Sequence, residues 1–290
     1  TLHNTLFPYT TLFRSSGHRL AVIAANLHLD TLNLMKDFDG LHKAVVSYIE
    51  KEPIEDEAFM SDVETLHREI RFKQCTILDD EEKWQKAASC FVQYYRDFPN
   101  SDYVDKALYN AALDFERQKE LGKAIQVRVF LLKATPNSDL VPKTLYNIGG
   151  NYHALAVYSQ AAKFYELFVK NFKKHEKAEG ALANASTFRY GLGQYDRAIE
   201  NYEKYLELYG EKNPKKAAEV AYQIAKIYEK QGKEDEAYEQ YEDFIDEFND
   251  TADMNRVLQA HAAVAQHYWD KGGESNRKRA LAEFAETLEV

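Results

Sequence analysis

The hydrophobic positions of this chain repeat along most of its length. In successive segments, aromatic and aliphatic residues follow an alanine at helical spacings of three and four residues. The anchoring alanines are Ala87, Ala124, Ala161, Ala198, Ala237 and Ala280. They lie 37, 37, 37, 39 and 43 residues apart, and a recurring interval of this size is typical of a repeat protein.

A second segment precedes each anchor and repeats with it. Aligned on the anchors, leucines coincide at Leu108, Leu145 and Leu182, amides at Asn110, Asn147, Asn184 and Gln223, and small residues at Ala112, Gly149, Ser186 and Ala225. A small residue opposite the anchoring alanine lets two helices cross closely. The pattern therefore predicts helix pairs, each of which must stack on its neighbours to bury both faces.

The ends of the predicted helices are marked by a repeated tetrapeptide. Pro99-Asn100-Ser101-Asp102 recurs 37 residues later as Pro136-Asn137-Ser138-Asp139. Proline followed by asparagine ends one helix, and serine followed by an acid is an N-cap signal for the next. With only 12 Gly and 6 Pro in 290 residues, the chain has few residues that favour long irregular loops, so the class is all-α.

The order of small residue, aromatic, glycine, aromatic, alanine and aromatic resembles the tetratricopeptide repeat. The fourth unit carries the resemblance best, at Ala225, Tyr228, Gly232, Ala237 and Tyr241, whereas the third has Arg189 in place of an aromatic. The resemblance implies a tetratricopeptide-type α-solenoid, a right-handed superhelix of antiparallel helix pairs. The 37-residue spacing exceeds the usual length of about 34, and the extra residues are expected to lengthen the first helix of each pair.

The resemblance extends from residue 68 to residue 290. The six expected helix pairs span 68–101, 105–138, 142–175, 179–212, 218–251 and 258–290. Residues 16–67 are expected to form degenerate N-terminal helices, with Leu41, Ala44 and Tyr48 in one of them and a long connecting helix at 55–80. Residues 1–15 lack this pattern and resemble translated sequencing-adaptor read-through. They are expected to lie outside the fold, on a fragment of metagenomic origin whose natural start is missing.

The net charge and the absence of known sequence motifs argue against several classes of function. The formal net charge of -10 disfavours binding to nucleic acid, and no apolar run is long enough to span a bilayer. No two histidines share a helical face at metal-binding spacing, and no catalytic motif occurs. We therefore expect no enzymatic activity, no cofactor and no metal. Cys75 and Cys90 fall on facing helices of one pair, where a disulfide is conceivable, but two buried free thiols are the expectation.

The first helices of tetratricopeptide arrays line a concave groove, so the resemblance also indicates candidate binding residues. Those expected to line a partner-binding groove are Tyr109, Asn110, Leu113, Tyr146, Asn147, His153, Asn184, Tyr190, Tyr222 and Lys226. Tyrosine gives a large contact area with a polar end, which suits peptide binding. The repeated asparagines are open to two interpretations, pairing with the backbone of a ligand or packing within each helix pair.

These observations favour a non-enzymatic scaffold for protein–protein interaction that binds a peptide or helix of a partner protein. One alternative is a regulatory array of a larger protein whose catalytic domain lies outside this chain. Another is an enzyme built on α-hairpins, which would need a deep pocket with two carboxylates. The chain is also similar to envelope-associated tetratricopeptide proteins of myxobacteria and their relatives. That similarity implies a periplasmic or cell-envelope location, with the cytoplasm as the alternative.

Overall fold

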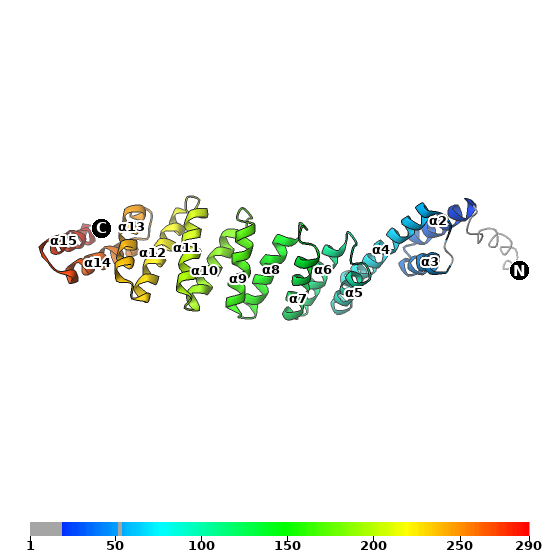
Figure 1. Cartoon of the computed structure of the whole chain (residues 1–290), viewed down its shortest axis with the longest axis horizontal. Coiled ribbons are helices and arrows are strands. Elements are labelled where there is room, and N and C mark those ends of the chain that lie inside the picture. The colour runs from blue at the N-terminus through cyan, green and yellow to red at the C-terminus, as the bar shows by residue number, and fades with distance from the viewer. Residues whose placement is uncertain (1–18, 52–53, 290) are drawn as a thin grey trace. The chain divides into compact units, whose positions relative to one another are not determined.

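The computed structural model describes residues 19–51 and 54–289 of the chain, and these form fourteen α-helices and no strand (Figure 1). The fold is therefore all-α and built of antiparallel helix pairs. Residues 1–15, for which an artefactual origin is expected, lie outside the described residues. The chain divides into two units, residues 1–144 and 145–290, and each is described by itself below.

The described residues of the first unit form six complete helices. They are α2 (Arg19–Leu34), α3 (Phe38–Glu50), α4 (Glu57–Asp80), α5 (Trp84–Asp97), α6 (Val104–Arg117) and α7 (Leu121–Ala134). Leu41 and Ala44 belong to a core shared by α2, α3 and the first half of α4. A second core joins the end of α4 to α5, α6 and α7. The helix α4 lies close to the bounds of the long connecting helix expected at 55–80.

The second unit begins within α8 (Val141–Ala154) and continues the alternation of helices and short connections. Its other helices are α9 (Tyr158–Asn171), α10 (Ala178–Gly191), α11 (Tyr195–Tyr209), α12 (Pro214–Gln231), α13 (Glu234–Phe248), α14 (Met254–Lys271) and α15 (Glu274–Glu289). Each of these helices packs on the next one along the chain.

The anchoring alanines occupy the helix contacts that the sequence pattern predicts. All six are fully buried, and each lies near the start of the second helix of a pair. Leu108, Leu145 and Leu182 are also buried, on the first helices. Small and branched side chains at these positions let the paired helices approach closely along their length.

The turns within the pairs share one backbone conformation. One or two residues after the first helix, the backbone has a positive φ in five turns, at Glu82, Lys119, Ala156, Gly193 and Gly232. This left-handed conformation commonly ends α-helices and favours glycine. Only two of the five turns have glycine there, so the repeat keeps the turn geometry even where the residue type does not favour it.

Two expectations about the connections between pairs are wrong. In the pairs that are spaced by 37 residues, the first helices α6, α8 and α10 have 14 residues each, the same length as α5 and α7, so the extra residues do not lengthen them. They lie in the connecting segments 98–103, 135–140 and 172–177. Ser101 is not the N-cap of α6, which begins at Val104. Its Oγ instead accepts a hydrogen bond from the Tyr103 backbone N–H at 3.2 Å and pairs with the Tyr94 hydroxyl at 2.6 Å.

The expectation of two free thiols is also wrong. Cys75 on α4 and Cys90 on α5 form a disulfide, with their Cα atoms 5.4 Å apart. This separation falls within the range that a disulfide requires. The repeat spacing places the two cysteines on facing helices, but it does not determine the distance between their side chains, which decides the bond.

Candidate partner-binding face

The predicted groove residues all lie on the first helices of successive pairs. Tyr109, Asn110 and Leu113 are half-buried residues of α6 in the first unit. In the second unit, α8 carries Tyr146, Asn147 and His153, α10 carries Asn184 and Tyr190, and α12 carries Tyr222 and Lys226.

The three repeated asparagines have polar groups that the protein does not use. Asn110, Asn147 and Asn184 are each half-buried, and in the described part of the chain their side-chain amides make no hydrogen bond. Each amide can donate two hydrogen bonds and accept two. Packing within the helix pair therefore does not require an amide here, and each position keeps its hydrogen-bonding capacity for water or a ligand.

Of the tyrosines at the neighbouring position, Tyr222 is buried by contacts within the structure. Tyr222 is only 7% exposed, and its ring centroid lies 5.6 Å from that of Tyr241 and 5.5 Å from that of Phe244 on α13. Its hydroxyl donates a hydrogen bond to Gln259 Oε1 on α14 at 2.7 Å, and burial raises the pKa of Tyr222 above its ordinary value. Tyr222 therefore offers little surface to a partner.

Tyr146 occupies the corresponding place on α8. Its ring packs 5.5 Å from Tyr165 and 5.6 Å from Phe168, both on α9, and remains half-exposed. The ammonium group of Lys177 lies 4.8 Å from the centroid of this ring. Tyr146 thus packs against the second helix of its own pair and remains partly exposed.

Side chains further along the first helices connect neighbouring pairs. His153 on α8 contacts Phe188 on α10, with ring centroids 4.7 Å apart. Tyr190 on α10 lies beneath the ammonium group of Lys230 on α12 at 4.8 Å. Lys226 pairs with Glu229, whose hydrogen bond raises the pKa of Lys226. In the second unit, His153 and Tyr190 therefore each contact a residue of the first helix in the next pair.

Comparison with known families identifies the repeat. Residues 180–212 and residues 219–251 each match a model of the tetratricopeptide repeat. Two segments of the chain are thus similar to the tetratricopeptide repeat. The matched ranges coincide with the helix pairs α10–α11 and α12–α13, which carry Asn184, Tyr190, Tyr222 and Lys226 on their first helices.

Solved tetratricopeptide proteins resemble the chain only distantly. One from Parabacteroides merdae is 17% identical, with 93% of each chain covered and a TM-score of 0.39. MamA is 19% identical over 65% of this chain and 92% of its own, with a TM-score of 0.40. YrrB, a tetratricopeptide protein with an unusual peptide-binding site, is 18% identical over 70% and 92%, with a TM-score of 0.37. No curated protein matches the sequence significantly. At these values the likenesses carry no argument about function.

Two of the repeated helix pairs have arginine in place of a core aromatic. Arg128 on α7 stands where other units have Phe91, Tyr165 or Tyr241, and Arg189 on α10 stands where others have Phe115 or Tyr152. Both arginines are fully buried. The departure at Arg189 is visible in the sequence, but the repeat pattern does not predict that this side chain forms a buried ion pair.

Each buried arginine has a carboxylate partner on the adjacent helix. Arg128 donates to both carboxylate oxygens of Glu116 on α6, at 2.8 and 2.7 Å. Arg189 donates to both oxygens of Glu166 on α9, each at 2.7 Å. Bidentate pairing compensates for removing the charges from water. A charged residue at a repeated core position is therefore a sequence signal for a partner one helix away.

The described residues include no group of three or more His, Cys, Asp or Glu side chains arranged to hold a metal ion. Among the same residues, no helix combines the length and apolar character needed to cross a membrane.

Proposed function

We propose that this protein is a non-catalytic scaffold that binds a peptide or helix of a partner protein along the first helices of its tetratricopeptide pairs. The observation that supports this proposal is the row of asparagine amides without an intramolecular hydrogen bond. Asn147 and Asn184 occupy equivalent positions on α8 and α10, within one unit of the structure. A half-buried amide that the fold does not use is well suited to a ligand.

The chemistry of this face favours recognition of main-chain groups. An asparagine can donate to a peptide carbonyl and accept from a peptide N–H at the same time. Residues that make van der Waals contacts flank the amides, with His153 and Tyr190 each partly accessible. A ligand held in this way is recognised by its backbone, and its side chains are selected by the aromatic surface around the amides.

A selection experiment with the full chain tests the proposal. Displayed random peptides would be selected on the wild-type chain, and the affinity of an enriched peptide would then be measured for Asn147→Ala/Asn184→Ala. Each lost hydrogen bond weakens binding by about 0.5–1.5 kcal/mol, so we expect roughly a 10-fold loss for the double variant. The matched control is Asn26→Ala, an exposed asparagine on α2. Equal affinity for the wild type and the double variant would refute the proposed face.

We also infer that the protein works in an oxidising compartment, with the bacterial cell envelope as the proposed site. The disulfide between Cys75 and Cys90 supports this location, because structural disulfides are rare in reducing cytosol. The test is to produce the chain with and without an export signal and to trap its thiols with a maleimide in acid-quenched cells. We expect the bond only in the exported chain. Equal oxidation of both forms would remove the support for an envelope location.

A further inference from the structure

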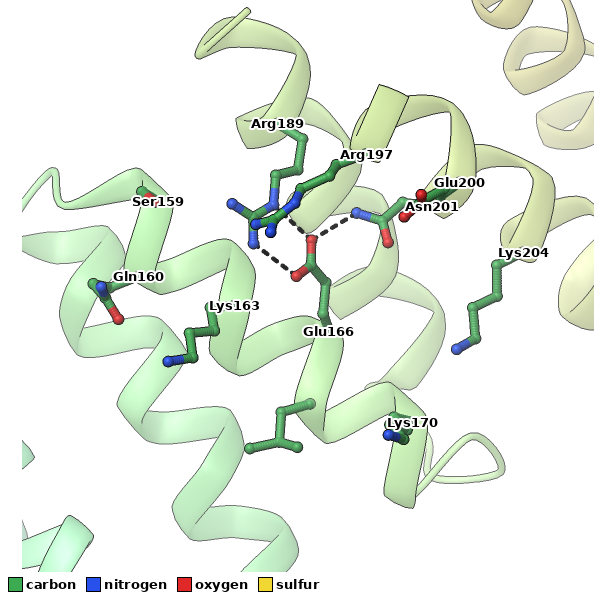
Figure 2. A pocket seen from close by; sticks show the side chains of 11 residues that line it. Ser159, Gln160, Lys163, Glu166, Lys170, Arg189, Arg197, Glu200, Asn201 and Lys204 are labelled. Atoms are coloured by element: carbon green, nitrogen blue, oxygen red, sulfur yellow. Dashed lines mark hydrogen bonds and ion pairs between the residues drawn. The ribbon is translucent and has the colours of Figure 1, made fainter. Parts of the chain in front are cut away.

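The second helices carry an open groove that is separate from the candidate partner-binding face. Its walls are α9 and α11, and Arg189 of α10 lies at its floor (Figure 2). The groove has a volume of about 690 Å³. Besides the ion pair at its floor, the charged residues that line it are Lys163, Lys170, Arg197, Glu200 and Lys204.

The floor of the groove is internally satisfied. Glu166 accepts two hydrogen bonds from Arg189 and a third, at 2.9 Å, from Asn201 Nδ2. Burial opposes ionisation of Glu166, but these hydrogen bonds outweigh it and lower the pKa of Glu166 below its ordinary value. Arg189 also donates to Gln194 Oε1 at 2.6 Å. The floor charges therefore neutralise each other, and the charges available to a ligand are those of the rim.

The rim is strongly basic. We call Lys163, Lys170, Arg197 and Lys204 the basic rim. None of these four side chains forms an ion pair with any described residue. On each wall the two cations are seven residues apart, two helical turns or roughly 10 Å. Unpaired cations concentrated in one groove of a chain with a net charge of -10 indicate an acidic ligand.

The next second helix, α13, carries the complementary charge. At the same positions relative to its anchoring alanine, α13 has only acids, which we call the acidic stripe: Glu236, Glu239, Asp243 and Asp246. All four are exposed, and within the described ranges none takes part in an ion pair. Their spacing matches the rim, since Glu236 and Asp243 are seven residues apart, as are Glu239 and Asp246.

We propose that the acidic stripe of one copy of the chain docks into the basic rim of a second copy. The two surfaces carry the same number of opposite charges at the same helical spacing, so parallel helices can pair them in register. Rim and stripe belong to the same unit, and a two-fold dimer would make the contact twice. This association uses the second helices and leaves the first-helix face free for a partner.

Charge reversal tests the proposed contact. The rim variant combines Lys163→Glu, Lys170→Glu, Arg197→Glu and Lys204→Glu, and the stripe variant combines Glu236→Lys, Glu239→Lys, Asp243→Lys and Asp246→Lys. Because exposed ion pairs are individually weak, sedimentation velocity should extend to roughly 100 µM of the full chain. We expect the wild type to associate with increasing concentration and each variant alone to remain monomeric.

The equimolar mixture of the two variants is the decisive sample. A reversed rim meets a reversed stripe, so association should return to the wild-type level. The stripe variant alone distinguishes this contact from a general charge effect. Its net charge is less negative than that of the wild type, so reduced general repulsion would make it associate more strongly, whereas loss of the specific contact makes it associate less. The control is Lys86→Glu/Lys133→Glu, which reverses two exposed lysines on α5 and α7. Circular dichroism checks that every variant keeps its helix content.

Two results would overturn the proposal. One is a wild-type chain that stays monomeric over the whole concentration range, which would leave the basic rim to an acidic segment of a different protein. The other is association of a folded rim or stripe variant as strong as that of the wild type, which would place the contact elsewhere.

Discussion

At the scale of single residues, the two buried arginines, Arg128 and Arg189, are each held by a carboxylate on the preceding helix. Arg189 links three helices, since it lies on α10 and reaches Glu166 on α9 and Gln194 before α11. A buried ion pair adds little net stability compared with well-packed apolar residues, but removal of one partner costs about 3–5 kcal/mol. The pair therefore favours one alignment of these helices over others that an aromatic side chain would tolerate.

A buried carboxyl group in the first unit makes stability depend on pH. Asp114 on α6 is fully buried beside Asp79 on α4, and Arg117 donates a hydrogen bond to Asp114 Oδ1 at 2.8 Å. Burial, followed by the neighbouring Asp79, raises the pKa of Asp114 from 3.8 to about 7, and Arg117 offsets only part of this effect. Between these two values, the folded chain holds a proton that the unfolded chain has lost.

The free energy of unfolding should therefore fall as pH rises from about 4 to about 7, because the folded state binds the extra proton. Three pKa units correspond to about 4 kcal/mol as an upper bound. Asp114→Asn should remove this contribution, so its stability relative to the wild type should increase from pH 5 to pH 8. Urea unfolding at both pH values measures the difference, with the exposed Asp62→Asn as the control. A difference between Asp114→Asn and the wild type that is independent of pH would show that Asp114 is ionised in the fold throughout.

At the scale of helices and turns, close packing rests on one small residue per first helix. A Cβ atom added at Gly149 on α8 would lie 2.7 Å from Cδ1 and Cε1 of Tyr165 on α9. Tyr165 is buried and already contacts Tyr146, so its ring has little room to move. The small residue therefore faces an aromatic ring one turn beyond the anchoring Ala161, and not the alanine itself.

Adjacent glycines allow a direct test of this contact. Gly149→Ala should destabilise the second unit by about 1–3 kcal/mol, because overpacking outweighs the helix propensity of alanine. Gly150→Ala should stabilise it by up to about 1 kcal/mol, because the nearest atom to its new Cβ is the Tyr165 hydroxyl at 3.8 Å. Chemical unfolding of the two variants measures both effects. Stabilisation by both substitutions would mean that Tyr165 can yield.

The elements were predictable from the sequence to the extent that they repeat. The spacing of the anchoring alanines located the paired helices, because a repeat exposes the core position shared by all units. It did not locate the extra residues, since insertion into a helix and insertion into a loop give the same period. Tyr222 occupies the same repeat position as Tyr109 and Tyr146, but the repeat pattern does not predict that its side chain packs against α13. The role of the buried arginines could not be predicted from the repeat either, because each arginine replaces the residue type that the other units share at its position.

At the scale of the whole molecule, the net charge conceals an uneven distribution. A formal charge of -10 indicates an acidic surface, yet the basic rim and the acidic stripe lie on neighbouring second helices of one unit. Net charge governs general repulsion between copies, whereas local charge governs specific contact. The acidic composition alone predicts that copies of the chain repel one another. The aligned charges on the second helices predict instead that two copies associate.

The chain has two cysteines, and they pair with each other. Its two thiols are therefore either both oxidised in this disulfide or both free. Denatured without a reductant, the full chain should react with no maleimide, and after reduction it should react with two. Closing a loop of 15 residues stabilises the folded state by about 3 kcal/mol, through the entropy of the unfolded chain. A reductant should therefore lower the unfolding temperature of the first unit by several degrees. Cys75→Ala/Cys90→Ala should unfold at a similarly low temperature and show no response to the reductant. An unchanged unfolding temperature after complete reduction would mean that the helix contacts of α4 and α5 already fix the first unit without the covalent bond.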